Sequence, residues 1–243
     1  MRIGILTDIH ANMEALEACL AALDARGYDY LACLGDVVGY GAQPNECCAV
    51  IRERADVAIL GNHDAAVCGR MDYSFYRLVA RQALDWHARQ LHPEHRAWLS
   101  SLPYQFRLGE VLFCHGSPVN LEEFEYIFSQ EQMRDLVATA PGQAPVTFIG
   151  HSHLCRAFAY DSQTCQEELR TRFTLETDRK YLITVGSVGQ PRDYDPRACA
   201  AIYDTESRRF EYLRVEYDID QAAARILATE LSPAFGKRLF LGV

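Results

Sequence analysis

The sequence lacks an excess of positive charge. Its 243 residues include 33 aspartates and glutamates but only 24 lysines and arginines, which gives a formal net charge of −9. This balance argues against a protein that grips nucleic acid through a broad basic face, so we expect no stable nucleic-acid complex. A small acidic substrate is compatible with the charge if a bound cation supplies positive charge locally. The hydrophobic fraction of 49% is too high for a disordered chain.

The sequence also lacks a long apolar run. The amino-terminal segment meets Asp8 after a few apolar residues, which is too short for the core of a signal peptide. No other run approaches the roughly 20 residues that a membrane-spanning helix needs. We therefore expect a cytoplasmic protein with no membrane partner.

Nine cysteines are present, but no two of them are spaced as C-x-x-C. A zinc ribbon or a thioredoxin-like site therefore has no spacing on which to rest. A disulfide framework fits poorly with the missing export signal. We expect most of the thiols to be small buried hydrophobic groups.

Strand-like and helix-like patterns alternate in the first third of the chain. Strands are expected at residues 2–7, 30–34 and 57–60, and helices at residues 13–26 and 44–54. Three such units in a row favour an α/β sheet with parallel strands at its centre. The length favours one domain over residues 1–243.

The middle of the chain changes to helical patterns. Helices at 73–90 and 93–102 would form most of a small insertion or lid, at about residues 66–103, and strands follow at 111–113 and 146–149. The last third predicts short strands at 156–160, 181–185, 198–203 and 210–215, and a helix at 218–231. We expect those four strands to pair as a second, more antiparallel sheet.

Five strand ends present side chains that can bind a metal ion. The five motifs are Asp8-Ile9-His10, Gly35-Asp36, Gly61-Asn62-His63-Asp64, His115-Gly116 and Gly150-His151-Ser152-His153. Because ligands of open α/β sheets bind at the carboxyl ends of the strands, these side chains should converge. Carboxylate, carboxamide and imidazole donors suit manganese, iron, zinc or cobalt. Seven such ligands suit two ions that share a bridging carboxylate.

In this order, the five motifs resemble those of the calcineurin-like metallophosphoesterases, and they extend from Asp8 to His153. The resemblance implies a two-sheet α/β sandwich of mixed sheets flanked by helices. It implies that one metal ion is bound by Asp8, His10 and His153, that the other is bound by Asn62, His115 and His151, and that Asp36 bridges them. His63 resembles the family's non-ligand histidine, which stabilises the transition state and protonates the leaving oxygen. Asp64 would orient a ligand or shape the turn.

At one motif this sequence departs from the phosphoprotein phosphatase branch of the family. In the phosphoprotein phosphatases of the family, the Gly-Asp motif continues to an aspartate that supports the catalytic histidine and an arginine that grips phosphate. Gly39 and Tyr40 stand at those positions here. The chain therefore looks more like the small prokaryotic-type members, many of which are phosphodiesterases or nucleotide hydrolases.

The resemblance implies a dinuclear-metal-dependent hydrolase of a phosphodiester or a nucleotide phosphoanhydride, such as a cyclic nucleotide or a dinucleoside polyphosphate. A hydroxide that bridges two divalent ions would attack phosphorus, with manganese preferred over iron and zinc. Two alternatives stay open: a phosphomonoesterase that acts on serine or threonine phosphate in proteins, and a non-catalytic scaffold of the same fold. The tail at residues 235–243 could dock on the domain or on a second subunit of a homo-oligomer.

Two groups of residues are candidates for substrate binding. Arg192, after the glycine-rich turn of residues 186–191, would contact a substrate phosphate or instead pair with Asp193 or Asp195. Tyr40 would contact the substrate, and one or two rings among Tyr40, Tyr73, Phe75 and Tyr76 would stack on a nucleobase, with ordinary packing as the favoured alternative. Three histidines fall outside the motifs and are expected at the surface: His87, His92 and His95.

Overall fold

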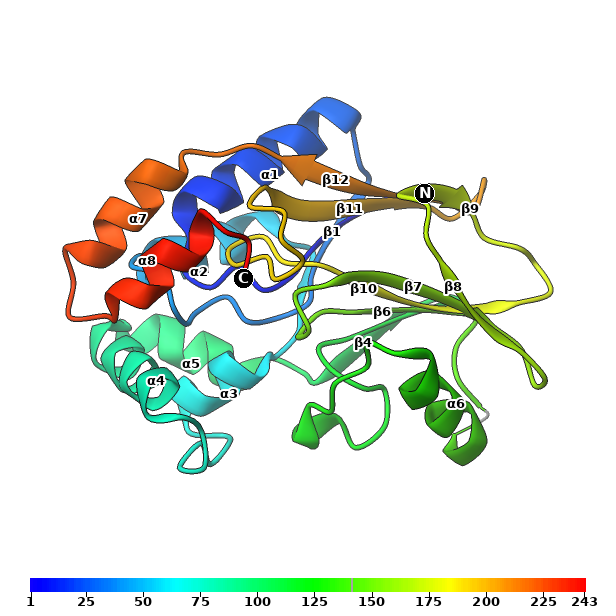
Figure 1. Ribbon diagram of the computed structural model, residues 1–243, viewed down its shortest axis with the longest axis horizontal. Coiled ribbons are helices and arrows are strands. Elements are labelled where there is room, and N and C mark those ends of the chain that lie inside the picture. The colour runs from blue at the N-terminus through cyan, green and yellow to red at the C-terminus, as the bar shows by residue number, and fades with distance from the viewer. Residues whose placement is uncertain (141) are drawn as a thin grey trace.

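Two six-stranded sheets lie face to face in the computed structural model, which describes residues 1–140 and 142–243. Helices flank the pair of sheets (Figure 1). A core between the sheets joins Ile5 of the first sheet to Phe113 and Phe148 of the second. This arrangement is the two-sheet α/β sandwich that the motifs imply, so the expected fold class is confirmed.

The first sheet has the strand order β3-β2-β1-β11-β12-β9. Its parallel half consists of β1 (Arg2–Leu6), β2 (Tyr30–Cys33) and β3 (Val57–Ala58). Its antiparallel half consists of β11 (Ala198–Asp204), β12 (Arg209–Val215) and β9 (Arg172–Thr174). The parallel strands predicted for the amino-terminal third are therefore present, in nearly the expected positions.

The second sheet has the strand order β4-β5-β6-β10-β7-β8. Its parallel strands are β5 (Val111–Cys114), β6 (Val146–Ile149) and β10 (Lys180–Val185), and its antiparallel strands are β4 (Gln105–Leu108), β7 (Cys155–Tyr160) and β8 (Cys165–Glu168).

The prediction that the four late strands form one sheet is wrong, because β7 and β10 belong to the second sheet while β11 and β12 extend the first. In β11 the residues from Ala198 to Tyr203 are all buried, which fits a strand covered on both faces. Such a pattern indicates an interior strand but does not say in which of two sheets it lies.

Helices α1 (Met13–Arg26) and α2 (Pro44–Arg54) have the predicted bounds. The side chain of Asn12 accepts a hydrogen bond from the backbone N–H of Ala15 and so caps α1. The helix ends at Gly27, whose φ of 72° lies in the left-handed region that glycine tolerates. Proline at the first position of α2 explains its sharp start.

The helix expected over residues 73–90 is shorter, because α4 covers only Leu78–Gln90. Asp72 accepts hydrogen bonds from the N–H and the hydroxyl of Ser74, and this local turn competes with helix formation. Helix α5 (Pro93–Ser101) follows, and α3 (Asn62–Cys68) precedes α4. Whether this helical region acts as a lid stays a prediction.

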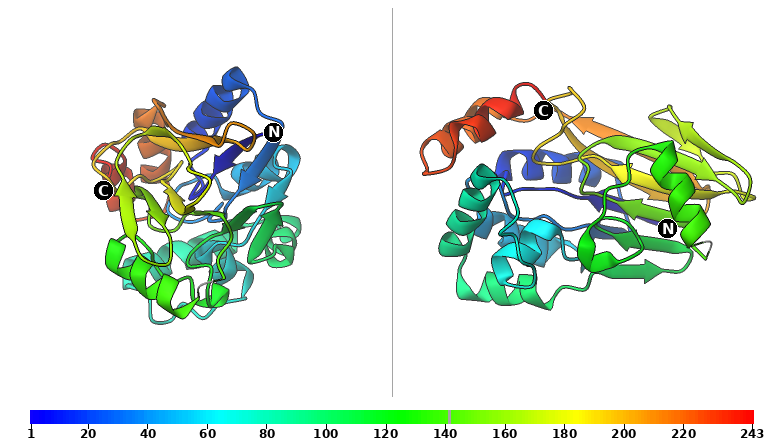
Figure 2. Two further views of the ribbon diagram at one scale, coloured as in Figure 1. Left: turned by 90° about the vertical axis from the view of Figure 1, so that its right-hand side faces the viewer. Right: turned by 60° about the horizontal axis from the view of Figure 1, so that its bottom comes forward.

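The remaining helices are η1 (Leu121–Glu123), α6 (Gln130–Thr139), α7 (Ile219–Leu227) and α8 (Pro233–Leu239). The final helix expected over 218–231 is therefore shorter, since α7 ends at Leu227, and α8 is a further helix in the tail, after the turn at Thr229 to Ser232. Helices α7 and α8 pack together at the end of the molecule that also carries α4 (Figures 1 and 2). In the described part of the chain, no helix combines the length and apolar character needed to cross a membrane.

The prediction that three histidines lie at the surface holds only for His92. His87 is fully buried and His95 is 7% exposed. The ring of His87 packs against Trp86, and its Nδ1 accepts a hydrogen bond from the backbone N–H of Gly39 at 3.4 Å. The packing of α4 against the loop after β2 therefore buries a histidine that its sequence neighbourhood places at the surface. All nine cysteines are free thiols, and none is exposed.

Candidate metal centre

The side chains from the five strand ends meet in one place, as their positions after parallel strands predict. Asp8 and His10 follow β1, Asp36 follows β2, and Asn62 and His63 follow β3. His115 follows β5 of the other sheet, and His151 and His153 follow β6. All eight side chains are buried, with at most 6% of their surface exposed.

Several of these residues have a strained backbone. The φ angles of Asp8, His10, Asp36, His151 and His153 lie between 48° and 65°. Non-glycine residues seldom adopt this left-handed conformation, and they keep it where the surrounding structure enforces it, often at functional sites. At these five residues the strain lies just after a strand, where the side chains converge.

The first cluster consists of Asp8, His10 and His153. The Nε2 atoms of the two imidazoles lie 3.0 Å apart, and Asp8 Oδ1 lies 3.3 Å from His153 Nε2. Each Nδ1 lies against a backbone carbonyl, Val38 O at 3.0 Å for His10 and Gln190 O at 2.5 Å for His153. Because a carbonyl only accepts, each Nδ1 carries the proton and each Nε2 directs a lone pair toward the other.

The second cluster consists of Asp36, His115 and His151, with Asn62 beside it. His115 Nδ1 donates a hydrogen bond to Leu34 O at 2.7 Å, so its proton position is fixed in the same way. Its Nε2 lies 3.1 Å from Asn62 Oδ1 and 3.4 Å from Asp36 Oδ2.

Asp36 joins the two clusters. The same oxygen, Oδ2, lies 3.6 Å from His10 Nε2 in the first cluster and 3.4 Å from His115 Nε2 in the second. Its other oxygen, Oδ1, accepts a hydrogen bond from the backbone N–H of His63 at 2.8 Å. The carboxylate is therefore held in the position that a bridging ligand would need.

Burial and mutual charges shift the pKa values of this site in opposite directions. Burial raises the pKa of Asp8 to about 7. Burial also acts to raise the pKa of Asp36, but the neighbouring imidazoles, His115 first, hold it well below its usual range. Burial acts to lower the pKa of His115, but Asp36 and Asp8 outweigh it and raise that pKa to about 9.

The residues present fit a pair of divalent cations. Two lone pairs that face each other at 3.0 Å repel, and so do two carboxylates in one buried site, unless positive charge lies between them. His10, His115 and His153 each pair the other ring nitrogen with a carbonyl, as metal-binding histidines commonly do. The mixed donors of carboxylate, carboxamide and imidazole suit borderline divalent metals.

His63 is close to the cluster but has an unusual environment. Its Nδ1 is buried and has no hydrogen-bond partner among the described residues. Burial lowers its pKa to about 4. A Cβ on Gly39 would lie 2.3 Å from His63 Nδ1, so no side chain fits at Gly39 without a shift of the imidazole. The aspartate that supports the catalytic histidine in the phosphoprotein phosphatases would stand at the position of Gly39. In this arrangement such a side chain is sterically excluded as well as absent.

Asp64 holds the turns of the site together. Its carboxylate accepts hydrogen bonds from the backbone N–H groups of Gly61 and Val38, each at 3.2 Å. It thereby ties the loop after β3 to the loop after β2. This geometry favours the turn-shaping role over that of orienting a ligand.

Arg192 lies beside the site and does not pair with either acidic neighbour. Asp193 pairs with Arg214, and Asp195 pairs with Arg197 at 2.6 Å. The Nη2 of Arg192 lies 3.4 Å from Tyr40 Oη and from Gln190 Oε1. Its charge is thus not neutralised by a carboxylate among the residues that the structure describes.

A cavity of about 620 Å³ opens beside the cluster, and its lining includes Asn62, His63, Tyr40 and Arg192. Sequence reasoning missed other residues that line it: Arg77, Tyr126, Phe235 and Arg238. No motif marks them. They come from a turn, a loop and the last helix, and only the fold brings them together.

The candidate stacking rings have different surroundings. Tyr40 packs on His10 and His63 with ring centroids 4.6 and 4.5 Å apart, and Tyr76 Oη accepts a hydrogen bond from Asn62 Nδ2. Tyr73 donates a hydrogen bond to Asp85. Phe75 lines the cavity and is 75% exposed. Phe75 is therefore the ring of the four that is most available to a ligand.

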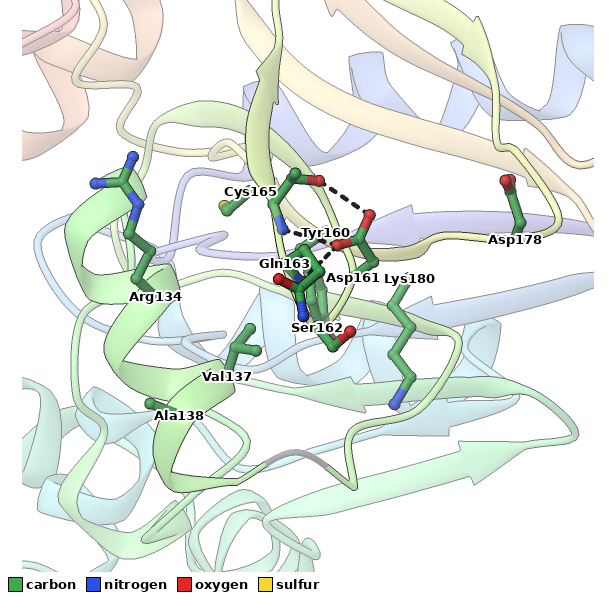
Figure 3. A pocket seen from close by; sticks show the side chains of 11 residues that line it. Arg134, Val137, Ala138, Tyr160, Asp161, Ser162, Gln163, Cys165, Asp178 and Lys180 are labelled. Atoms are coloured by element: carbon green, nitrogen blue, oxygen red, sulfur yellow. Dashed lines mark hydrogen bonds between the residues drawn. The ribbon is translucent and has the colours of Figure 1, made fainter.

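A second cavity, of about 640 Å³, lies between α6 and the β7–β8 hairpin (Figure 3). It contains none of the side chains of the metal centre. Asp161 at its centre accepts hydrogen bonds from the backbone of Gln163 and Thr164 and closes its own turn. The cavity beside the strand ends is therefore the better candidate for a substrate.

The fold and the buried acid–imidazole cluster together define a metallophosphoesterase architecture. Residues 1–208 match the model of the calcineurin-like phosphoesterase superfamily domain. The chain belongs to this superfamily.

Known proteins resemble the chain over nearly its full length. An uncharacterized protein of Methanocaldococcus jannaschii, MJ0912, is 36% identical over 244 residues, which cover 99% of this chain and 98% of that protein. The crystal structure of a metallophosphoesterase from Sphaerobacter thermophilus is 36% identical, with a TM-score of 0.86 and coverage of 100% and 99%. A hypothetical protein from Pyrococcus horikoshii, PH1004, shares the fold at 20% identity, with a TM-score of 0.78 and coverage of 100% and 98%.

Proposed function

We propose that the protein hydrolyses a phosphodiester or a nucleotide phosphoanhydride with the help of two divalent metal ions. The observation that carries this proposal is the position of Asp36, whose Oδ2 faces an imidazole of each cluster. Membership of a phosphoesterase superfamily supports the reaction class. We also propose that residues 1–243 act as a single domain, since the tail contributes Phe235 and Arg238 to the cavity.

In this proposal, Asp8, His10 and His153 bind one ion, Asn62, His115 and His151 bind the other, and Asp36 binds both. When bound, two such ions would supply Lewis acidity and an activated water for direct attack on phosphorus. Manganese is our first choice, with iron or zinc as alternatives.

The side chains around the ions have separate tasks. His63, at the edge of the cavity, would donate a proton to the leaving oxygen once the negative charge of a bound phosphate raises its low pKa. Arg192 would bind a non-bridging phosphate oxygen, because no carboxylate occupies its guanidinium and such charge-assisted contacts are strong. The ring of Tyr40 supports the histidines and lies 5.7 Å from that guanidinium.

A substrate screen of the metal-reconstituted protein tests this function. We expect hydrolysis of bis-p-nitrophenyl phosphate and of cyclic nucleotides or dinucleoside polyphosphates, and little release of phosphate from a phosphopeptide. Asp36→Asn should lower kcat by about a thousandfold or more, since it removes the shared ligand. Asp220→Asn, an exposed change on α7, is the matched control.

Four results would contradict the proposal. Full activity after exhaustive chelation, or a normal rate in the Asp36→Asn variant, would exclude the metal mechanism. A preference for the phosphopeptide would instead support the monoesterase alternative. Failure to bind any divalent ion would support the scaffold.

A further inference from the structure

Three arginines surround the cavity beside the metal centre. Arg77 precedes α4, Arg192 follows the glycine-rich turn, and Arg238 lies on α8, so they come from three distant parts of the chain. None of them forms an ion pair with a carboxylate of the described residues. No aspartate or glutamate side chain lines this cavity in the described part of the chain.

This local charge contrasts with the rest of the protein. Acidic residues outnumber basic ones by 33 to 24 in the sequence, and many surface arginines are paired, such as Arg26 with Glu211 and Arg54 with Asp24. A cavity with three unpaired guanidinium groups and no acidic side chain is therefore a concentrated positive site on an acidic protein. Such a site raises the local concentration of anions.

The helix that carries Arg238 is fixed over the cavity. Phe235 of α8 packs on Tyr40 with ring centroids 5.0 Å apart. After the helix, Gly242 O accepts a hydrogen bond from the backbone N–H of Tyr194 at 2.8 Å. Both contacts join the tail to loops near the metal centre, so Arg238 is held at the cavity that Arg192 also lines.

The first turn of α4 adds to the positive potential. Val79 and Ala80 of this turn line the cavity, and no side chain caps the helix. The amino end of a 13-residue helix carries a partial positive charge from its unpaired N–H groups. Arg77 lies at this end.

The three arginines reach the cavity from different elements, and in the described part of the chain only Arg192 has a contact with a ring that packs on the histidines of the metal centre. Arg192 lies close to the metal centre, because its Nη2 is 3.4 Å from Tyr40 Oη and the ring of Tyr40 packs on His10 and His63. Arg238 reaches the cavity from α8, whose Phe235 packs on Tyr40. Arg77 lines the cavity from the position just before α4. A phosphoryl group at the metal centre would thus contact Arg192, while Arg77 and Arg238 face whatever extends outward from it.

We infer that Arg77 and Arg238 form, with Arg192, a second anion subsite, and that the substrate carries a phosphate chain rather than a single phosphodiester. This inference rests on the proposed function and names the substrate class: a nucleotide phosphoanhydride with at least one phosphate beyond the one attacked. In the hydrolysis, the oxygen of water bonds to phosphorus, the P–O bond of the anhydride breaks, and the leaving phosphate keeps the bonding electron pair. A diester with a single charge has no second phosphate that Arg77 and Arg238 could bind.

The test compares two substrates and two double variants. Arg77→Gln with Arg238→Gln removes the outer charges, and Arg96→Gln with Lys237→Gln removes two exposed charges that do not line the cavity. We expect the first pair to lower kcat/KM for diadenosine tetraphosphate by about tenfold or more, mainly through KM. The value for bis-p-nitrophenyl phosphate should change less than about twofold, and the control pair should leave both substrates unchanged.

An equilibrium measurement separates this inference from the proposed function. Fluorescence anisotropy of a labelled adenosine tetraphosphate should show weaker binding in the Arg77/Arg238 variant than in the control, whether or not the protein hydrolyses it. Wild-type protein that cleaves neither substrate would refute the proposed function, and the binding assay would still decide the subsite. Equal binding by the two variants, or equal losses on both substrates, would overturn the inference.

Discussion

The Nε2 atoms of His10 and His153 lie 3.0 Å apart, although the two residues are 143 positions apart in sequence. The carbonyls of Val38 and Gln190 fix the proton of each ring on Nδ1. Each Nε2 therefore presents a lone pair to the other. A cation bound by both nitrogens would convert this repulsion into attraction, and it links the two sheets because His10 follows β1 and His153 follows β6.

Removal of metal should therefore destabilise the whole sandwich. Binding at a hundredfold excess over the dissociation constant stabilises a fold by about 2.7 kcal/mol per site. For a chain of this length, such a loss lowers Tm by roughly 5–10 °C per site. Differential scanning calorimetry before and after treatment with EDTA, and after manganese is restored, measures the change.

A matched pair of histidine variants locates this effect. His153→Gln should bind fewer ions and lose much of the Tm gain from manganese. His92 is exposed and belongs to a group with Glu94 and the buried His95, next to the positive Arg52, so the His92→Gln variant should keep the gain. Identical behaviour of the two variants would contradict the assignment of His153 as a ligand.

Metal binding should release a proton at mildly alkaline pH. The pKa of His115 is raised from 6.5 to about 9 because Asp36 and Asp8 outweigh the effect of burial, so His115 is protonated in the metal-free protein at pH 8. This pairing stabilises the metal-free fold fully below about pH 6.5, and the stabilisation is lost as pH rises toward 9. Since only the neutral imidazole binds a metal, the ion must displace this proton.

Calorimetric titration of manganese in buffers of different ionisation enthalpy measures the proton count. At pH 8 we expect about one proton released per protein and an apparent affinity that rises with pH up to about 9. His115→Gln should release none. Proton uptake, or an affinity that falls between pH 7 and 9, would contradict this mechanism.

The sequence allowed the metal centre to be predicted because each of its motifs comes shortly after the end of a strand. The strand-end rule places Asp8, Asp36 and His115 at one edge whatever the details of the sheets. It did not predict that β11 joins the first sheet, because periodicity reports burial and not the identity of the neighbouring strand. For the same reason the burial of His87 was not predicted, since it depends on how α4 packs against Gly39.

The substrate side of the site could be predicted least. Arg77 and Arg238 belong to no motif, and α8 reaches the cavity only because Phe235 packs on Tyr40. From the sequence alone, the tail is a segment of mixed basic and apolar residues, and nothing in it indicates where it packs. Tertiary contacts, rather than local pattern, bring these side chains to the cavity.

His63 should act on the leaving group and not on metal content. His63→Gln is expected to lower kcat for a 3′,5′-cyclic nucleotide by about 10²–10⁴-fold, the usual contribution of a general acid. The loss should be smaller for bis-p-nitrophenyl phosphate, because p-nitrophenolate leaves without a proton. Elemental analysis should find the same metal content as in the wild type. A reduced metal content would instead make His63 a ligand, in the group that it forms with His10 and Asp36.

Arg192→Ala should weaken substrate binding without loss of stability. Its guanidinium makes two long hydrogen bonds of 3.4 Å, to Tyr40 Oη and Gln190 Oε1, and we expect KM to rise about tenfold with Tm nearly unchanged. Arg214→Ala is the matched control, because Arg214 is largely buried and pairs with Asp193, so its loss leaves that carboxylate unpaired. That variant should lower Tm by several degrees and leave KM unchanged. Steady-state kinetics and thermal denaturation of both variants decide the matter, and an unaltered KM in Arg192→Ala would rule out contact between Arg192 and the substrate.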